Sequence, residues 1–333
     1  MQVSRRKFVR DLGALAMGGI ACCKTAANVA EAGLAERPIV DTHVHLWDRS
    51  RLTPPWLKPG EPLCRSYLPT DYQQAIAGLN IVKSVYMEVA MDPADEVAEA
   101  ENVIAVCRGR ATPIQWAVIG GRPASAGFRR YLLPFKGSPC IKGVRQLLRT
   151  PSELQLLAAP DDLVRGLRLL GEWGMCFDLC VPPTALADGA RLIGRCGETR
   201  FVLDHCGNAD PRAFRRGGQS AASEPGPTHD PQQWRRDIER IARHKNVVCK
   251  ISGLVSQLVP GQWTADDLAP IVNHCLDTFG PERVMFAGNW PVCTKGASLR
   301  QWVEALKAIV GPRGPADQRR LFHDNAVRFY ELA

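Results

Sequence analysis

From residue 38 onward, short runs of β-branched and other apolar residues alternate with longer segments in which apolar residues recur at helical spacing. This alternation is typical of strands joined by helices. The pattern predicts strands at 39–46, 81–90, 113–120, 141–147, 175–181, 200–206, 246–252 and 283–289. It predicts helices at 69–79, 93–108, 161–174, 183–195, 231–244, 265–279, 298–309 and 315–332, with a short one near 125–133.

Eight strands, each followed by a helical segment, predict a single-domain (β/α)8 barrel of the TIM type. A doubly wound α/β sheet is the competing fold. No G-x-G-x-x-G or P-loop motif follows any predicted strand, so the usual reason to expect that sheet is missing. The barrel is therefore favoured, and its chemistry is expected at the C-terminal ends of the strands.

The first 35 residues do not follow this pattern. Arg5 and Arg6 lie in the run SRRKFV, which is typical of a twin-arginine export signal, and the apolar stretch 12–23 after them is too short to span a membrane. We therefore expect residues 1–35 to be a leader and linker, 36–333 to be the folded domain, and the protein to be exported to the periplasm. Lipid attachment at Cys22 is the alternative, although the usual Leu is missing there.

Composition excludes several other classes of protein. The net charge is +8, of which the leader holds +3, so the folded domain carries +5. No Lys/Arg-rich block with interleaved aromatic residues occurs, so we do not expect nucleic acid as a partner. No apolar run reaches the length of a membrane span, so we expect no stable membrane insertion. A small, anionic or sugar-derived substrate is compatible with the mild positive charge, and so is a homo-oligomer.

Ten of the twelve cysteines lie outside the leader, and none form a C-x-x-C pair. Several fall within predicted strands. We expect them to be small, buried, apolar residues with free thiols.

Two histidines stand one residue apart at the end of the first predicted strand, in the run IVDTHVHLWD. Because residues i and i+2 of a strand share a face, His43 and His45 should lie side by side with Asp41 behind them. Two imidazoles together can form half of a metal site or donate to one oxyanion. The alternative is a polar strand end in contact with solvent.

Other predicted strands also end on polar residues. These are Glu88 on the second strand, Arg145 on the fourth, His205 on the sixth, Lys250 on the seventh and Asn289 on the eighth. Any one of them could be structural. Together with the histidine pair they place polar groups from six strands at one rim of the barrel, which predicts an active site there.

The runs DTHVHLWD, GVR, VLDHCG, VCKISGL and RVMFAGNWPV, in this order, resemble the amidohydrolase superfamily. They are most similar to its branch of sugar-lactone and pyrone-dicarboxylate lactonases, the L-fuconolactonase-like proteins. The resemblance covers the chain from about residue 39 to its end. It implies a TIM barrel in which water held at the mouth hydrolyses a lactone or related ester of a sugar acid or small carboxylate.

The resemblance also implies roles for individual residues. His43, His45 and His205 match the histidines that surround the scissile carbonyl or one divalent metal ion, for which zinc is the expectation. Arg145 and Lys250 match positions that hold a substrate carboxylate or hydroxyl. Members of the family work with or without a metal, so a metal-independent mechanism remains an alternative.

The last motif departs from the family pattern, which commonly has Asp where this chain has Asn289. An amide cannot accept a proton at neutral pH. Three explanations remain: the three histidines hold zinc and supply hydroxide, Glu88 acts as the base, or the protein binds an acidic sugar without catalysis. Non-oxidative decarboxylation, which relatives in the superfamily perform, is a further alternative.

Two predicted loops, 49–68 and 208–230, are long for a barrel and follow strands that end in histidines. They could form a wall over the site, with Trp47 and Trp56 stacked on a sugar ring. Trp290, next to Asn289, is a further candidate for substrate binding. The alternative is that these tryptophans pack back onto the barrel.

Overall fold

The computed structural model describes residues 37–158, 160–215 and 226–333. The predicted leader and the middle of the 208–230 loop lie outside the described residues. Residues Pro38–Ala333 form one compact unit. None of the helices in the described residues is long and apolar enough to cross a membrane.

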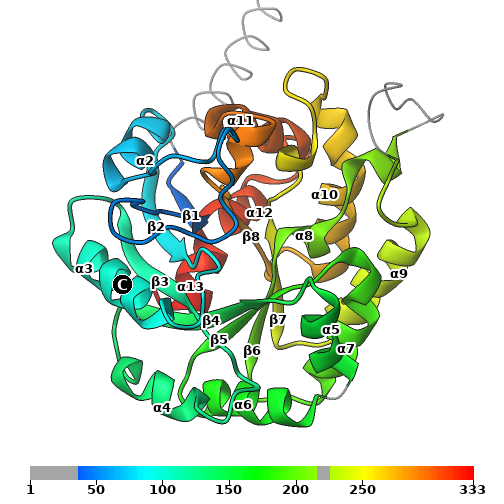
Figure 1. The fold of residues 1–333 in the computed structure, drawn as a ribbon. Helices are drawn as coiled ribbons and strands as arrows, with labels where there is room; N and C mark the ends of the chain where they lie inside the picture. The colour runs from blue at the N-terminus through cyan, green and yellow to red at the C-terminus, as the bar shows by residue number, and fades with distance from the viewer. Residues whose placement is uncertain (1–36, 159, 216–225) are drawn as a thin grey trace, which may run out of the picture. The chain divides into compact units, whose positions relative to one another are not determined.

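Eight parallel strands form one sheet in the order in which they occur in the chain, which confirms the predicted barrel. The strands are β1 (Ile39–Val44), β2 (Ile81–Met87), β3 (Ile114–Gly120), β4 (Ile141–Leu147), β5 (Cys176–Cys180), β6 (Arg200–Leu203), β7 (Val247–Ile251) and β8 (Val284–Phe286). Helices surround them (Figure 1). Several strands end before the predicted residue, because their last residues turn into the loops at the mouth.

The barrel closes between β1 and β8, although these strands do not form a full ladder. Val44 and Trp290 form an isolated bridge, and the N–H of His45 donates to the Trp290 carbonyl oxygen over 2.7 Å. The N–H of Asn289 donates to the His43 carbonyl oxygen over 2.8 Å. The first and last motifs of the chain therefore meet at the mouth.

The connecting helices bury an apolar stripe against the strands. They are α2 (Pro69–Ala75), α3 (Glu96–Gly109), α4 (Phe128–Leu132), α5 (Pro151–Ala158), α6 (Asp161–Glu172), α7 (Leu186–Gly194), α8 (His205–Asn208), α9 (Pro231–Ala242), α10 (Ala265–Phe279) and α11 (Leu299–Val310). In α11, Ser298 and Gln301 form a capping box that fixes where the helix begins. Helix α5 was not predicted.

The sequence predicted one helix over residues 315–332, and this prediction was wrong. The segment divides into α12 (Pro315–Arg319), a π-helical turn (Arg320–Asp324) and α13 (Asn325–Tyr330). The wider turn lets the consecutive Leu321 and Phe322 both reach the core. Tyr330 packs in the cluster that includes Val40 at the start of β1. This segment therefore covers the N-terminal end of the barrel and leaves the opposite end as the mouth.

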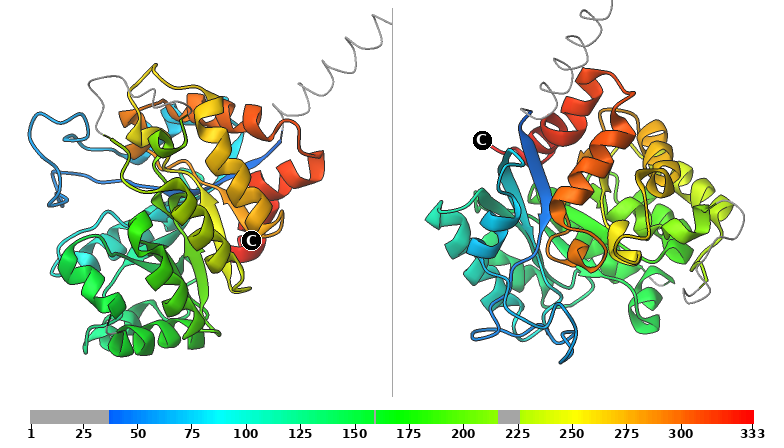
Figure 2. Two further views of the ribbon diagram at one scale, coloured as in Figure 1. Left: turned by 90° about the vertical axis from the view of Figure 1, so that its right-hand side faces the viewer. Right: turned by 90° about the horizontal axis from the view of Figure 1, so that it is seen from above.

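The 49–68 segment projects from the barrel as an arm in both views of Figure 2. Two tryptophans fasten it. The indole N–H of Trp47 donates to the Arg65 carbonyl oxygen over 2.6 Å, and that of Trp56 donates to the Val89 carbonyl oxygen over 2.6 Å. The rings of Trp47 and Trp56 also meet edge to face, 5.4 Å between centroids. These contacts match the alternative in which the tryptophans pack back onto the barrel.

Candidate active site

The two histidines at the end of β1 lie side by side, as predicted. The Nε2 atoms of His43 and His45 are 3.1 Å apart. Nδ1 of His45 lies 3.0 Å from the carbonyl oxygens of Met87 and Glu88. Because a carbonyl oxygen only accepts, Nδ1 of His45 carries the proton and Nε2 presents its lone pair.

Asp41 does not join the histidines at the mouth. Its carboxylate accepts the Gly288 N–H over 2.7 Å and the Tyr72 hydroxyl over 2.9 Å. The strand register shifts between Asp41 and Val44, so simple alternation fails there. Asp41 thus fastens β1 to the residues after β8 and to α2, and burial raises its pKa to about 6.

His205 completes a cluster of three imidazoles. Its ring centroid lies 4.5 Å from that of His43, and its Nδ1 lies 2.8 Å from the hydroxyl oxygen of Ser252. The backbone of His205 has a φ of 55°. Gly253, with a φ of +78°, lies directly against it, since a Cβ at Gly253 would come within 2.6 Å of the His205 Cβ. The glycine after Ser252 therefore makes room for this imidazole.

All three imidazoles are neutral at neutral pH. Burial lowers the pKa of His43 well below its usual value and lowers the pKa of His45 and of His205 to about 3. The positive charge of Arg145 adds to this effect at His45 and His205. Neutral imidazoles keep a lone pair, which is the state that binds a metal or accepts a proton from water.

Asp204, which the sequence analysis missed, lies at the centre of the site. Its Oδ1 is 3.5 Å from Nδ1 of His43 and 3.5 Å from Nζ of Lys250, and its Oδ2 accepts from Nη1 of Arg145 over 3.3 Å. Burial raises the pKa of Asp204, but the charge of Lys250 outweighs it and holds that pKa well below the usual range. The signal was present as an acid at the end of an apolar strand, in VLDHCG.

Glu88 and Arg145 form a buried ion pair. Nε of Arg145 lies 2.5 Å from Oε1 of Glu88, and Nη2 donates to the Glu88 carbonyl oxygen over 2.8 Å. The other carboxylate oxygen of Glu88 accepts the Ala90 N–H over 2.5 Å. Both side-chain oxygens of Glu88 are therefore already hydrogen-bonded. The Nη1 of Arg145 remains directed at His43, 3.3 Å from its Nε2.

Lys250 is fully buried inside the barrel, below the mouth. Its Nζ lies 2.5 Å from Oδ2 of Asp178 and 5.8 Å from the centroid of the Tyr330 ring. The ammonium group is thus paired with Asp178 and Asp204 rather than extended to solvent. Asp178 was also missed, and its signal was a single acid within the apolar run CFDLC.

The remaining predicted residues lie around this cluster. Asn289 is buried, with a φ of 54°, beside the strand end that carries His43. The Trp290 ring packs on Tyr67 and Tyr72, with centroids 5.4 Å and 5.3 Å away. Trp47 lines a cavity of about 280 Å³ between the 49–68 arm and α3. Both tryptophans are buried and pack on other aromatic residues.

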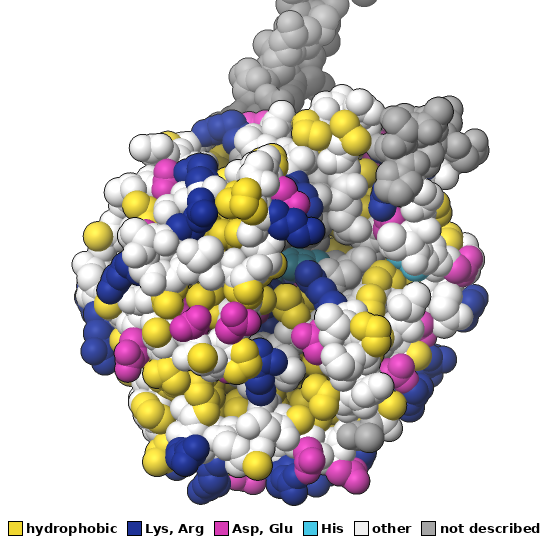
Figure 3. All heavy atoms as spheres, viewed as in Figure 1, with side chains coloured by type: hydrophobic (Ala, Val, Ile, Leu, Met, Phe, Trp, Pro, Cys, Tyr) yellow, Lys and Arg dark blue, Asp and Glu magenta, His cyan; other side chains and the backbone are white. Residues whose placement is uncertain are grey.

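Arg149 is an exposed cation near the site that the sequence did not reveal. Its Nη2 lies 3.4 Å from Sγ of Cys180 at the end of β5, and its charge contributes to the low pKa of His205. Figure 3 shows a histidine at the bottom of a hollow near the centre of this face, with a Lys or Arg side chain beside it.

The residues present fit one divalent metal ion. Ligand atoms of His43, Asp204 and His205 all lie within 4.8 Å of one another. Within the described residues, neither Nδ1 of His43 nor Oδ1 of Asp204 has a hydrogen-bond partner, although both are buried. An imidazole binds one ion through one nitrogen, so His43 would use either Nδ1, which lies beside Asp204, or Nε2, which lies 3.1 Å from Nε2 of His45.

The charges of the site also favour a cation. Among the described residues, the buried carboxylates of Glu88, Asp178 and Asp204 form ion pairs with two buried cations, Arg145 and Lys250. The buried set therefore carries an excess negative charge. A bound cation would offset this excess, since an unbalanced charge is costly where water is excluded.

A (β/α)8 barrel with these polar groups at its C-terminal mouth is typical of an enzyme. Residues 40–332 match the model of the Amidohydrolase family, which is nearly the whole described domain. The chain belongs to the amidohydrolase family, and it is a hydrolase.

Curated relatives confirm the resemblance to the lactonase-like branch. The chain is 27% identical to the L-fucono-1,5-lactonase of Burkholderia multivorans over 303 residues, which cover 88% of this chain and 96% of that protein. It is 22% identical to the L-rhamnono-gamma-lactonase of Scheffersomyces stipitis, over 90% of this chain and all of that protein. An amidohydrolase from Burkholderia multivorans solved with bound zinc has the same fold, with a TM-score of 0.75 at 23% identity over 89% of this chain and all of that one.

Proposed function

We propose that the protein hydrolyses the lactone of a sugar acid, or a closely related ester, at the mouth of the barrel. The observation that carries the proposal is the cluster of three neutral histidines beside Asp204 and Arg145. The names of the curated relatives, which are sugar-acid lactonases, support this class of substrate.

His43, His45 and His205 hold one divalent metal ion in this proposal, zinc by the chemistry of the donors, with Asp204 as a further ligand. When bound, such an ion polarises the lactone carbonyl and lowers the pKa of water. The chain prepares the imidazoles for this role. The carbonyl oxygens of Met87 and Glu88 orient the His45 ring, and the Ser252 hydroxyl orients the His205 ring.

Arg145 and Lys250 act mainly through other residues in this proposal. Two donors of Arg145 are engaged with Glu88, so the remaining Nη1 is the one directed at Asp204 and His43. Lys250 keeps Asp204 ionised from below. Direct contact with substrate falls to Arg149, which is exposed, and to the Asn289 amide, which can donate to a hydroxyl or ring oxygen.

The test combines metal analysis with a panel of lactones. The purified protein is assayed for bound metal and for acid released from L-fucono-1,5-lactone, L-rhamnono-gamma-lactone and other aldonolactones. We expect about one metal ion per chain, turnover of at least one sugar lactone, and loss of both in His45→Ala. His274→Gln, which changes a half-buried histidine on α10, is the matched control and should keep both.

The other readings give different results in the same assay. Turnover without bound metal, unaffected by chelators, supports the metal-independent mechanism. Binding of a sugar acid without turnover of any lactone supports a binding protein. Release of CO2 from an aromatic or sugar carboxylate supports a decarboxylase. Equal lactone turnover in folded His45→Ala and in the parent protein contradicts the proposal.

A further inference from the structure

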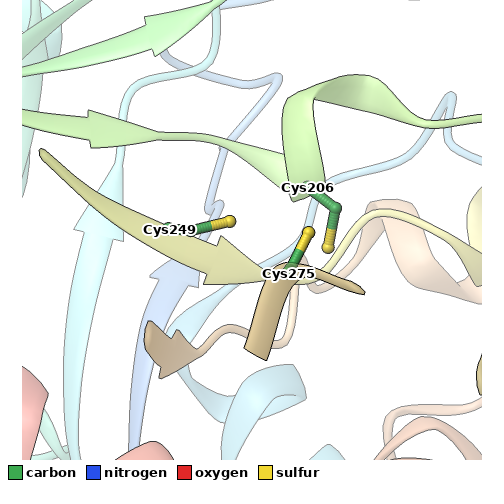
Figure 4. A group of neighbouring side chains, drawn as sticks. All are labelled: Cys206, Cys249 and Cys275. Atoms are coloured by element: carbon green, nitrogen blue, oxygen red, sulfur yellow. The ribbon is translucent and has the colours of Figure 1, made fainter. Parts of the chain in front are cut away.

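Three cysteine thiols converge outside the histidine site. Cys206 follows β6, Cys249 lies in β7 and Cys275 lies on α10, and all three are fully buried. Their sulfur atoms lie within 4.8 Å of one another. Figure 4 shows the three side chains directed into the space between these elements. Each thiol comes from a different element, so the cluster is a product of the fold that no C-x-x-C spacing could reveal.

The backbone around the cluster is arranged in an unusual way. Cys206 has a φ of 51° and Gly207 a φ of 65°, so α8 is not a regular helix there. This conformation is uncommon for a residue with a side chain, and it directs Cys206 toward Cys249 and Cys275. The thiols of Cys206 and Cys249 both donate to the Lys250 carbonyl oxygen, over 3.7 Å and 3.8 Å. Burial raises the pKa of the Cys249 and Cys275 thiols, a cost that binding of a cation would offset.

We propose that Cys206, Cys249 and Cys275 form a binding site for one monovalent copper ion. Sulfur donors select soft metals such as Cu(I). Three sulfurs around one ion at about 2.3 Å lie about 4 Å apart, so the observed separations need to close by less than 1 Å. Zinc in structural sites takes four ligands, and the grouped donors among the described residues number three here. Cu(I), unlike zinc, forms stable three-coordinate thiolate complexes.

On binding, copper stays in the +1 state, each S–H bond that breaks gives a Cu–S bond, and the protons pass to buffer. The site is separate from the histidine cluster, because Lys250 points into the barrel while its neighbour Cys249 points out toward α10. The inference does not depend on the proposed lactone hydrolysis.

The test uses the whole chain, produced in cells grown with added copper and purified without oxygen. We expect one Cu(I) per chain that resists a Cu(I) chelator such as bathocuproine disulfonate, and a near-ultraviolet absorption from thiolate-to-copper charge transfer. Bound metal should also raise the unfolding temperature. Cys275→Ser should lose copper, absorption and the temperature shift, and Cys275→Ala is a second variant in case the serine impairs folding. Cys107→Ser, at another buried cysteine on α3, should keep all three.

The histidine site could also take copper, so His45→Ala is included and should keep the charge-transfer absorption. Copper content that is lost with His45→Ala but not with Cys275→Ser overturns the proposal. A second result also overturns the proposal: the protein contains no copper and its mass is 2 Da lower than that of the reduced chain. That mass would show a disulfide among these cysteines, so the cluster would be a redox pair instead.

Discussion

Arg145 donates two hydrogen bonds to Glu88. Its Nε donates to the carboxylate over 2.5 Å, and its Nη2 donates to the backbone carbonyl oxygen over 2.8 Å. The pair fixes the end of β4 against the end of β2 at the mouth of the barrel. The guanidinium is buried and also contacts Asp204. Arg145 therefore has a structural role, because its ion pairs keep Glu88 and Asp204 in place.

Arg145→Met should therefore reduce stability strongly. It leaves the Glu88 and Asp204 charges without their cation, and removing one partner of a buried pair typically costs about 3–5 kcal/mol. Chemical denaturation measures this loss. Arg300→Met, which removes an exposed partner of Glu304, is the control and should cost less than about 1 kcal/mol. Equal losses in the two variants would show that the Arg145 pair contributes nothing beyond a surface pair.

The rim of the barrel could be predicted from the sequence because strand ends meet at one place in this fold. His43, His45, His205, Glu88 and Arg145 all reach the site for that reason. Their partners could not be predicted in the same way. Asp204 and Asp178 each stand alone in an apolar run, and only the closed barrel shows that they face Lys250. The ion pair of Arg145 with Glu88 could not be predicted either, because the two residues lie on different strands.

The raised pKa of Glu99 predicts that the free energy of unfolding falls as the pH rises. It accepts hydrogen bonds from the Tyr86 hydroxyl and the Val89 N–H, both over 2.7 Å. Burial, with the nearby Glu88 charge, raises the pKa of Glu99 to about 8 from 4.5. Because the pKa of Glu99 is higher in the folded state than in the unfolded state, protonated Glu99 contributes to the free energy of unfolding. This contribution is complete below pH 4.5 and is lost as the pH rises through about 8.

Glu99→Gln removes this titration while keeping an oxygen for both donors. Between pH 4.5 and 8, its free energy of unfolding should therefore gain a few kcal/mol relative to the parent protein. Denaturant unfolding at several pH values measures the difference. Glu101→Gln, at an exposed position on the same helix, should show no such trend. A constant difference between Glu99→Gln and the parent would mean that Glu99 has an ordinary pKa.

Gly253→Ala should damage the histidine cluster directly. The added Cβ would lie within 2.6 Å of the His205 Cβ, so His205 must shift, which disturbs the contact of its Nδ1 with the Ser252 hydroxyl. Gly261→Ala is a matched control, because Gly261 has a nearly equal φ of +73° but open space around it. Both variants suffer the strain of a left-handed backbone, about 1–2 kcal/mol. Only Gly253→Ala should also lose metal binding and lactone turnover, and full activity in that variant would separate His205 from the catalytic site.

Export is a prediction of the leader, which lies outside the described residues. A receptor reads the twin arginines as an address, so Arg5→Lys with Arg6→Lys should leave the protein in the cytoplasm. Cell fractionation measures this. The arginine pair at 129 and 130 on α4 provides the control, since its double lysine variant should be exported normally. Export of the leader variant at the parent level would remove the periplasmic assignment.

Asn289→Asp tests how the site works without the usual strand-eight carboxylate. Asn289 is buried next to the strand end that carries His43, and the site already holds an excess negative charge. An added carboxylate should strengthen the affinity for zinc by on the order of tenfold or more, through its attraction to a divalent ion. If the histidines already hold a metal, lactone turnover should change by less than about tenfold. Asn273→Asp on α10 is the control for a new charge and should alter neither quantity.

Glu88→Gln completes this comparison. If Glu88 were the general base in place of the missing Asp, turnover would fall by about 10²–10⁴-fold. Both of its oxygens are already hydrogen-bonded, to Arg145 and to the Ala90 N–H, so we expect a smaller loss in turnover and a clear loss of stability. Steady-state kinetics and denaturation of the same preparation separate the two effects. A loss of 10²-fold or more in a stably folded Glu88→Gln, recovered when Asn289→Asp is added, would instead assign the proton transfer to Glu88.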